Sequence, residues 1–342
     1  MTHSDPTYVI AEIGVNHNGD VGLAKQMIDV AADAGADAVK FQTFFADELV
    51  TRSAKKAAYQ LATTDTAQSQ YDMLKALELT ADEFADLNTY CVAKNIAFLS
   101  TPFSFRAVDL LDDVGVHAFK VSSGDLTYVQ MLDHMARKGK PVILSTGMGT
   151  LSEIEDAVRT IEAAGNTQIS ILHCVSNYPA AAEDCNLAAM NTIGAAFGYP
   201  VGWSDHTQGA AMSLAAVARG AKIIEKHITL DVTMDGPDHS ASMMPDEFAQ
   251  MMRDIRNIEI AIGTGVKRPT TAELNTAEVA RRSLTVARDM KAGEILSDDD
   301  IAILRPGTGL QPKQLPMVLG QRLAVDIVHG TPLMMTHFDA RS

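Results

Sequence analysis

Short runs of apolar residues recur along the first three-quarters of the chain, and segments with helical spacing separate them. Apolar runs that alternate with helical segments predict βα units and a parallel sheet. Eight such runs within roughly 260 residues predict a closed (β/α)8 TIM barrel, since an open doubly wound sheet usually needs fewer strands. The predicted strands are residues 8–14, 38–42, 97–100, 118–121, 141–147, 169–174, 200–204 and 221–229.

Amphipathic helices are predicted between these strands from apolar residues spaced three or four apart. A capping box predicts a helix start at Thr80, with Glu83 three residues later. The same pattern predicts a second start at Ser152, with Glu155. An apolar stripe over residues 245–262 predicts the helix that completes the barrel. The first helix is expected to bury Leu23, Met27, Val30 and Ala34.

Two segments interrupt the repeat. Residues 44–78 form a polar connection with no clear period, which we interpret as a lid or excursion. We expect residues 1–265 to form the barrel, residues 266–282 a linker, and residues 283–342 a turn-rich α+β or β-clip module. The module is small enough to be marginal alone, so we expect it to pack on another surface.

Polar side chains stand at the carboxyl ends of all eight predicted strands. The strands themselves are nearly free of charge before their last turn. In a TIM barrel this end carries the functional groups, so these residues predict the site. They are Glu12, Lys40, Gln42, Ser100, Thr101, Lys120, Ser123, Ser145, Thr146, Tyr178, Ser204, His206, Glu225 and His227.

Two histidines are candidate metal ligands. Ile223, Glu225 and His227 share one face of their strand, because side chains alternate along a strand. A buried acid and imidazole need a partner. For this strand alone, a core histidine beside an ion-paired glutamate is the favoured interpretation. His206 at the neighbouring strand end favours a divalent cation held by His206 and His227.

The lysines at the strand ends predict an anion site. Ammonium and hydroxyl groups together suit a phosphate and a carboxylate. A Schiff base, as in metal-free aldolases, is one alternative for Lys40 or Lys120, and a solvated side chain at a strand end is another. The predicted anion-binding groups are Lys40, Thr101, Lys120, Ser123, Ser145 and Ser204.

Composition and charge narrow the function classes. A formal net charge of −15 disfavours binding to nucleic acid or to anionic lipid. The chain has neither an apolar run near the ~20 residues that span a bilayer nor a secretory signal, so we expect a cytoplasmic protein with no membrane partner. Three cysteines without CxxC spacing predict neither a disulfide framework nor a zinc knuckle.

Eight motifs in order resemble the sialic acid synthases, which condense phosphoenolpyruvate with an N-acylated mannose-type sugar. The resemblance covers nearly the whole chain, because residues from about Ser283 onward are similar to the antifreeze-like (SAF) domain at the C-terminus of that family. The motifs lie at residues 11–19, 39–43, 100–103, 119–124, 144–148, 204–207, 225–227 and 236–239.

The resemblance implies a role for each matching residue. His206 and His227 would bind Mn²⁺ or Mg²⁺. Glu12 and Glu225 would handle protons and developing charge, with Lys40 and Lys120 beside them as catalytic residues. The groups implied to hold phosphoenolpyruvate are Lys40, Thr101, Lys120, Ser123, Ser145 and Ser204, and those implied to meet the sugar are Gln42, Tyr178 and Asp238.

The resemblance also implies a domain-swapped homodimer. Arg305 would reach from the C-terminal domain into the barrel of a partner chain and hold the N-acyl group of the sugar. Asp125 departs from the family pattern, because relatives acting on N-acetylmannosamine often have Glu there. The stretch 59–74 resembles bacterial legionaminic-type synthases, so a 2,4-diacetamido-trideoxy sugar is an alternative acceptor to N-acetylmannosamine.

Two other functions compete with the synthase. A metal-dependent aldolase would use pyruvate in place of phosphoenolpyruvate. A non-catalytic carbohydrate or ice binder would use the C-terminal module and would not depend on His227.

Overall fold

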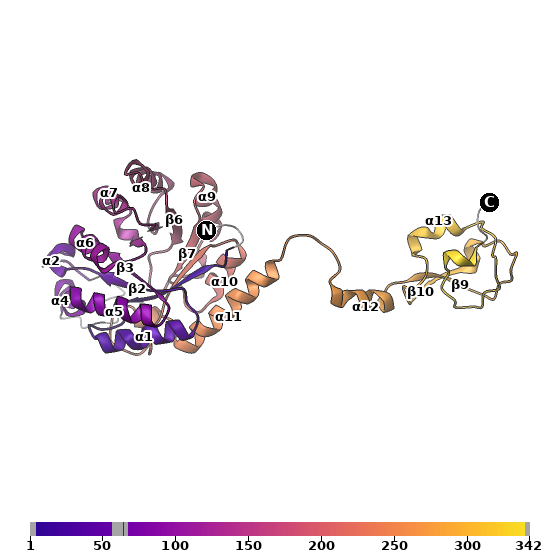
Figure 1. The fold of residues 1–342 in the computed structure, drawn as a ribbon, viewed down its shortest axis with the longest axis horizontal. Helices are drawn as coiled ribbons and strands as arrows, with labels where there is room; N and C mark the ends of the chain where they lie inside the picture. The colour runs from indigo at the N-terminus through magenta and orange to yellow at the C-terminus, as the bar shows by residue number, and fades with distance from the viewer. Residues whose placement is uncertain (1–4, 57–63, 65–67, 339–342) are drawn as a thin grey trace. The chain divides into compact units, whose positions relative to one another are not determined.

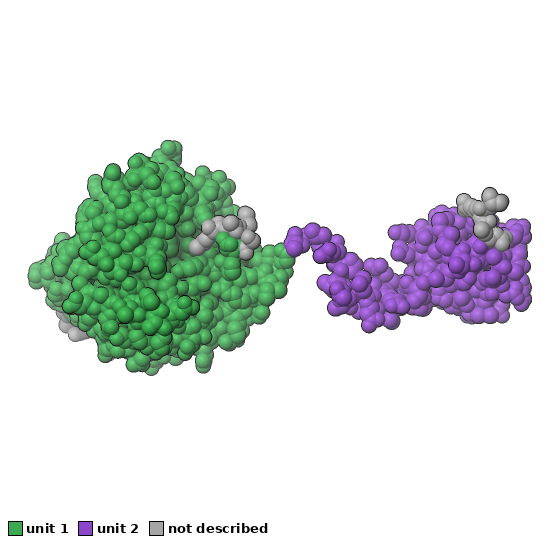
Figure 2. Space-filling view, viewed as in Figure 1, with its two compact units in different colours: residues 1–263 green, residues 264–342 purple. Residues whose placement is uncertain are grey.

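The protein divides into two compact units, coloured separately in Figure 2, which comprise residues 1–263 and 264–342. A computed structural model describes residues 5–56, 64 and 68–338. Each unit has a hydrophobic core of its own. The site residues predicted at the strand ends all lie in the first unit.

Parallel strands surrounded by helices form unit 1 (Figure 1). The hydrogen-bonded order is β3-β2-β1-β8-β7-β6-β5-β4, and the sheet curls until β3 and β4 lie against each other. The unit is therefore a nearly closed (β/α)8 barrel, which confirms the predicted fold. The strands are β1 (Tyr8–Gly14), β2 (Ala38–Thr43), β3 (Ala97–Pro102), β4 (Phe119–Val121), β5 (Val142–Ser145), β6 (Ile169–Cys174), β7 (Val201–Asp205) and β8 (Ile223–His227).

Helices pack around the barrel, and the first of them is turned from its predicted orientation. Met27 is fully buried as expected, but Ala24, Ile28 and Ala31 complete the buried face in place of the other predicted residues. Short alanine side chains let this helix approach the strands closely. The helices are α1 (Val21–Asp33), α5 (Ala81–Ala93), α6 (Phe105–Val114), α7 (Val129–Arg137), α8 (Leu151–Ala163), α9 (Ala188–Phe197), α10 (Ala211–Ala218) and α11 (Pro245–Ile262).

One of the two predicted capping boxes is correct. Thr80 and Glu83 cap α5 as expected. The prediction for α8 is wrong, because Thr150, whose backbone is extended, caps that helix with Glu153. Ser152 already lies inside the helix, so its hydroxyl cannot occupy the N-cap position.

The segment 44–78 is more ordered than its sequence suggests. It contains α2 (Ala46–Leu49) and α4 (Gln70–Leu77), and Ser69 caps α4 by accepting the Asp72 N–H. The expectation of no regular period is therefore wrong for α4. Residues 59–63 and 65–67, part of the stretch compared with legionaminic-type synthases, lie outside the described residues.

Unit 2 is a small module built around a two-stranded antiparallel sheet. Its strands are β9 (Ser283–Val286) and β10 (Ile301–Leu304), and a short helix, α13 (Leu315–Val318), follows. A ten-residue helix, α12 (Thr271–Ala280), precedes the module and has no buried side chain. Among the helices that the structure describes in either unit, none is both long and apolar enough to cross a bilayer.

Candidate active site

An apolar layer closes the lower interior of the barrel. Strand β7 contributes Gly202 to this layer, and neighbouring atoms leave no room for a larger side chain at this position. A Cβ there would lie 2.3 Å from the Ile223 carbonyl oxygen and 2.6 Å from a Leu172 methyl carbon. The other strands supply Ile10, Ala38, Leu99, Ala118, Ile143, Leu172 and Ile223.

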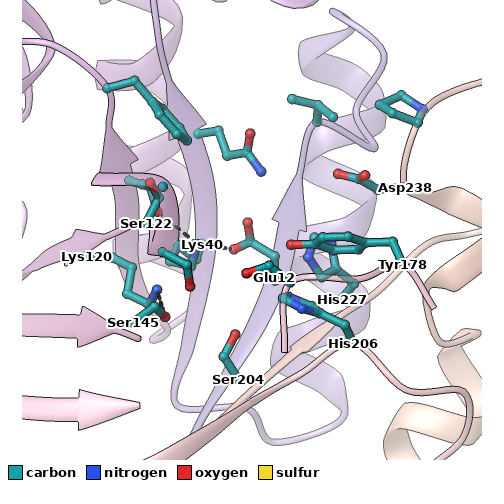
Figure 3. Close-up of a pocket in the computed structure, with 18 of the residues that line it drawn as sticks. Glu12, Lys40, Lys120, Ser122, Ser145, Tyr178, Ser204, His206, His227 and Asp238 are labelled. Carbon is teal, nitrogen blue, oxygen red and sulfur yellow. Dashed lines mark hydrogen bonds and ion pairs between the residues drawn. The ribbon is translucent and has the colours of Figure 1, made fainter. Parts of the chain in front are cut away.

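A polar layer lies two residues further along every strand. Side chains with a period of two point the same way, so each residue that follows an apolar interior residue by two also faces inward. The layer lines a cavity of about 540 Å³ (Figure 3). Cys174 is the one member that the sequence analysis missed, although its place two residues after Leu172 could have indicated it. The layer consists of Glu12, Lys40, Thr101, Lys120, Ser145, Cys174, Ser204 and Glu225.

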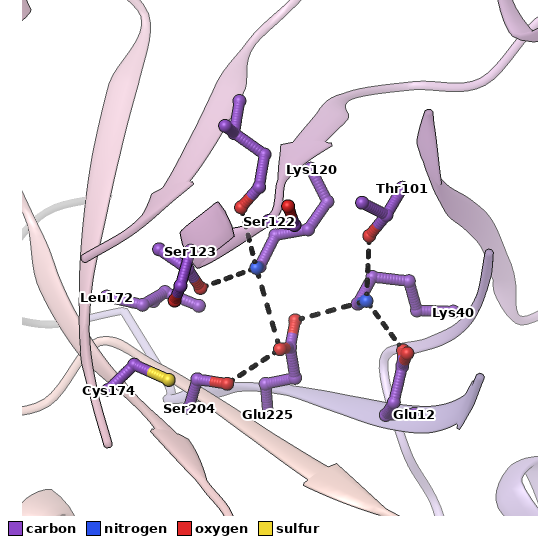
Figure 4. Close-up of polar contacts among 12 residues, drawn as sticks. Glu12, Lys40, Thr101, Lys120, Ser122, Ser123, Leu172, Cys174, Ser204 and Glu225 are labelled. Atoms are coloured by element: carbon purple, nitrogen blue, oxygen red, sulfur yellow. Dashed lines mark hydrogen bonds and ion pairs between the residues drawn. The ribbon is translucent and has the colours of Figure 1, made fainter. Parts of the chain in front are cut away.

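Two buried lysines and two buried glutamates form a connected network in this layer (Figure 4). Lys40 Nζ lies 2.7 Å from Glu12 Oε2 and 3.8 Å from Glu225 Oε2. Lys120 Nζ lies 3.6 Å from Glu225 Oε1. Both lysines are at most 3% exposed, so the alternative of solvated side chains is wrong.

Hydroxyl groups complete the network. Lys40 donates to Thr101 Oγ1 at 2.9 Å, and Lys120 donates to Ser145 Oγ at 2.5 Å. Ser204 donates to Glu225 Oε1 at 2.8 Å. The floor of the cavity therefore holds ammonium and hydroxyl donors in one place, as binding of an oxyanion requires.

The two glutamates have opposite tendencies to ionise. Burial raises the pKa of Glu12 to about 7, against the opposing effect of Lys40. Burial also acts on Glu225, but the ammonium groups of Lys120 and Lys40 outweigh it and hold its pKa at about 2. One carboxyl group can thus exchange a proton near neutral pH while the other stays charged, a division typical of acid–base sites.

The Tyr178, His206 and His227 rings lie across the cavity from Lys40 and Lys120 (Figure 3). The ring centroids of His206 and His227 are 5.5 Å apart, and the Tyr178 ring lies 4.0 Å from that of His206. His206 Nδ1 lies 2.7 Å from the Val175 carbonyl oxygen, so this hydrogen bond uses Nδ1 and not Nε2. Both histidines line the cavity, as predicted.

The two imidazoles suit a divalent cation. Burial holds the pKa of His227 well below its usual value, so the ring is neutral, and its buried Nδ1 has no hydrogen-bond partner among the described residues. Burial alone would lower the pKa of His206, but the Cys174 sulfur and the Val175 carbonyl raise it, which favours a second proton on the ring. A cation bound at Nε2 would replace the proton on that nitrogen. The described residues contain no group of three or more His, Cys, Asp or Glu side chains placed to hold a metal. A cation here would therefore take its other ligands from water and substrate.

The remaining predicted residues divide between the units. Gln42, Ser123 and Asp238 line the same cavity as the polar layer. Arg305 is exposed on unit 2, and the structure does not place that unit relative to the barrel. Asp125 is not among the residues lining this cavity, and it accepts a hydrogen bond from Ser122 at 2.6 Å.

Hydrogen bonds from Asn16, in the loop after β1, fix the position of the loop that carries Asp238. Asn16 Nδ2 donates to the Ile228 carbonyl at 2.8 Å and to Ser242 Oγ at 2.9 Å. Ser242 in turn donates to the Asp238 carbonyl at 2.7 Å. The Asn-His-Asn-Gly turn thus positions Asp238 and does not itself line the floor.

His17 in the same turn predicts acid sensitivity. The side chain is 1% exposed, and its Nδ1 accepts the Gly19 N–H at 3.0 Å, so the ring must be neutral. Burial lowers its pKa from 6.5 to about 4. Because the folded pKa is depressed, the stabilisation is complete above pH 6.5 and is lost as the pH falls toward 4, which amounts to about 3 kcal/mol.

Urea unfolding at several pH values tests this expectation. The His17→Gln variant should lose less stability than the unchanged protein between pH 6.5 and 4, whereas His134→Gln, at a more exposed position, should show the unchanged slope. Equal slopes for His17→Gln and the unchanged protein would contradict the assignment.

Comparison with known proteins agrees with this geometry. A NeuB family model matches residues 27–267, and a SAF domain model matches residues 281–339. The chain belongs to the NeuB family. This NeuB-family chain is 43% identical to the N,N'-diacetyllegionaminic acid synthase of Legionella pneumophila, over 97% of this chain and 95% of that protein. It is 45% identical to the enzyme of the same name from Campylobacter jejuni, over 92% of this chain and 95% of that one.

A solved structure shares the fold of this NeuB-family chain. It is the N-acetylneuraminic acid (sialic acid) synthetase of Leptospira borgpetersenii in complex with citrate, with a TM-score of 0.71 and 37% identity. The match covers 80% of this chain and 91% of that one. The predictions of an enzyme of the sialic acid synthase family and of a C-terminal SAF domain are therefore confirmed.

Proposed function

We propose that this enzyme condenses phosphoenolpyruvate with an N-acylated mannose-type sugar, giving a nine-carbon sialic-acid-type sugar and phosphate. The observation that carries the proposal is the buried floor, where two lysines and several hydroxyl groups surround two carboxyl groups beneath two imidazoles. Phosphoenolpyruvate has a phosphate and a carboxylate, and buried ammonium and hydroxyl donors bind both. The names of the relatives support the same class of reaction.

Each substrate would occupy its own part of the cavity. The acceptor sugar would lie nearer the mouth, against Gln42, Tyr178 and Asp238. Burial raises the pKa of Asp238 to about 6, so near neutral pH this side chain can accept hydrogen bonds from sugar hydroxyls. The groups that would hold phosphoenolpyruvate are Lys40, Thr101, Lys120, Ser123, Ser145 and Ser204.

The proposed bond changes begin with attack of C3 of phosphoenolpyruvate on the aldehyde carbon of the open-chain sugar. The aldehyde oxygen takes up a proton, and C2 of the former enol becomes cationic. Water adds to C2 and gives up a proton. The bond from C2 to the bridging oxygen then breaks as the C2 hydroxyl gives up its proton, so phosphate leaves with the bridging oxygen and that proton, and the 2-keto acid remains.

The residues of the floor would assist each step. Glu12, with a pKa of about 7, can exchange the protons of the aldehyde oxygen and of water. Glu225, ionised and enclosed by the protein, would stabilise the cationic carbon. Lys40 and Lys120 would neutralise the departing phosphate. A Mn²⁺ or Mg²⁺ ion held by His206 and His227 would supply polarisation of the aldehyde oxygen.

An assay of phosphate release tests the proposal. The protein, Mn²⁺ and phosphoenolpyruvate should release phosphate when N-acetylmannosamine or 2,4-diacetamido-2,4,6-trideoxymannose is added. We favour the second sugar, because two relatives at 43% and 45% identity are named N,N'-diacetyllegionaminic acid synthases. An absence of phosphate release with every N-acylated mannose-type sugar would overturn the proposal.

A metal-free pyruvate aldolase that forms a Schiff base on Lys120 is the second candidate, and one observation favours it. Burial lowers the pKa of Lys120, which is a property of lysines that form Schiff bases. Lys40 does not share this property, because the carboxylates of Glu12 and Glu225 outweigh burial and raise its pKa, which keeps that side chain charged. Pyruvate in place of phosphoenolpyruvate separates the two functions, since only an aldolase would use it.

We also propose that the enzyme acts as a homodimer in which Arg305 reaches the barrel of the partner chain. Arg305 is exposed at the end of β10, where its guanidinium group can meet a substrate carbonyl. Arg305→Ala should therefore lower phosphate release about 10-fold or more while the barrel stays folded. Lys313→Ala, another exposed change in unit 2, is the control. Full activity of Arg305→Ala, or a monomer in light scattering, would contradict this arrangement.

Cytoplasmic localisation stays a prediction.

A further inference from the structure

The end of β6 and the loop that follows it hold the His206 ring and backbone together. His206 Nδ1 lies 2.7 Å from the Val175 carbonyl oxygen and 3.7 Å from the Cys174 sulfur. The Tyr178 ring lies over the imidazole with the two centroids 4.0 Å apart and an interplanar angle of 32°. The Ala180 N–H donates to the His206 carbonyl at 2.9 Å. One short segment therefore makes four contacts with this histidine.

His206 depends on such contacts more than His227 does. His227 is the last residue of β8, so the pleat of the strand directs its side chain into the barrel. His206 lies one residue beyond the end of β7. Its ring orientation is therefore set by the groups that touch it.

Strand pairing places the Cys174 sulfur beside this ring. Strands β6 and β7 are parallel, and Cys174 pairs with Ser204, its neighbour in Figure 4. Ser204 and Cys174 both face the cavity, and His206 follows Ser204 by two residues. The sulfur meets the ring at Nδ1, which is the nitrogen that does not face the proposed cation.

Cys174 supports the ring from a position that other side chains do not fill. The thiol is buried, and it also lines a separate cavity of about 400 Å³ beside α8 and α9. Open space therefore lies next to the sulfur, and its removal would enlarge that space. The cysteine is also not placed as a metal ligand, because the described residues contain no group of three or more His, Cys, Asp or Glu side chains that could hold an ion.

We propose that Cys174 is a positioning residue, whose thiol holds the His206 ring so that Nε2 faces the cavity and can bind the cation. A carbonyl oxygen can only accept, so Nδ1 carries the proton in its bond to Val175, and the sulfur is a second, weak acceptor beside it. This arrangement fixes the ring and directs the Nε2 lone pair toward the cation. The inference rests on the proposed function in one respect, that a divalent cation binds at His206 and His227.

Manganese binding to the metal-free protein, followed by electron paramagnetic resonance without substrates, tests the inference. Cys174→Ala should raise the Kd for Mn²⁺ about 10-fold or more, as loss of a group that orients a metal ligand typically does. Cys174→Ser should recover most of the affinity, because its hydroxyl can accept from the same N–H. The matched control is Cys91→Ala, which removes a buried thiol of the core on α5 and should leave the Kd unchanged. If Cys174→Ala does not fold, Cys174→Val, which fills the volume without accepting a hydrogen bond, should show the same loss.

Cadmium separates positioning from direct binding. Thiolate sulfur prefers soft cations, so a cysteine ligand would favour Cd²⁺ over Mn²⁺. Cys174→Ala should weaken both ions by the same factor when Cd²⁺ is measured by displacement of Mn²⁺. A much larger loss for Cd²⁺ would make Cys174 a ligand and overturn the inference.

Three other results would also contradict the positioning role. They are an unchanged Kd for Mn²⁺ in folded Cys174→Ala, a raised KM for phosphoenolpyruvate without a change in that Kd, and no manganese binding by the unchanged protein. Because binding is measured without turnover, a protein that shows the expected Kd changes but releases no phosphate would overturn the proposed function and leave this inference intact.

Discussion

Replacement of His227 by alanine is expected to abolish manganese binding and to slow phosphate release by more than about 100-fold. Loss of a group that only orients a metal ligand typically lowers metal affinity or activity about 10- to 100-fold. Loss of one of two protein ligands should therefore lower both by more. His227 is neutral in the folded protein, because burial holds its pKa well below the usual value, and it can therefore bind a cation without first losing a proton.

Manganese electron paramagnetic resonance measures binding separately from turnover, because free and bound Mn²⁺ give different spectra. His206→Ala should behave like His227→Ala, whereas His134→Ala, in a more exposed ion pair with Asp109, should bind manganese normally. A non-catalytic carbohydrate binder would show no such dependence. Undiminished manganese binding by both His206→Ala and His227→Ala would show that the cation site lies elsewhere.

A second large effect is expected from Lys226→Met, on stability. Lys226 and Asp205 form an ion pair at 3.2 Å with both side chains fully buried. Asp205 also accepts hydrogen bonds from Thr207 and Ser213, and Lys226 donates to the Thr207 carbonyl, so the pair fixes the turn that carries His206. Removal of one partner from a buried pair leaves the other charge uncompensated and should cost about 3–5 kcal/mol.

Urea unfolding followed by tryptophan fluorescence measures this cost in the barrel alone. The chain has one tryptophan, Trp203, which is fully buried on β7 close to the pair. Lys25→Met, which removes a partly exposed ion pair with Asp86, should cost less than about 1 kcal/mol. Asp205→Asn combined with Lys226→Met should recover part of the loss. If Lys226→Met cost no more than Lys25→Met, the pair would have no such structural role.

The floor of the site was predictable from sequence because it follows from strand geometry. A period of two, applied to strands already located by their apolar runs, places Lys40, Lys120 and Glu225 inside the barrel. The same rule indicates Cys174, but a cysteine after an apolar run is also an ordinary core residue, as Cys91 and Cys185 are in this protein.

Features that depend on packing between distant segments were not predictable in the same way. The face that α1 buries depends on how closely its alanines approach the strands, and the start of α8 depends on backbone angles at Thr150. The apolar cluster beside α4 forms only because Met73 and Leu77 meet Val15 and Phe44, which come from other parts of the chain.

The fate of the bridging oxygen of phosphoenolpyruvate tests the proposed condensation most directly. The substrate would carry oxygen-18 between C2 and phosphorus, and phosphorus NMR would follow the isotope in the presence of Mn²⁺ and 2,4-diacetamido-2,4,6-trideoxymannose. Cleavage of the C–O bond at the floor of Lys40, Lys120, Glu12 and Glu225 predicts that all released phosphate contains the label. Release of unlabelled phosphate, or formation of product from pyruvate without phosphate, would contradict the account.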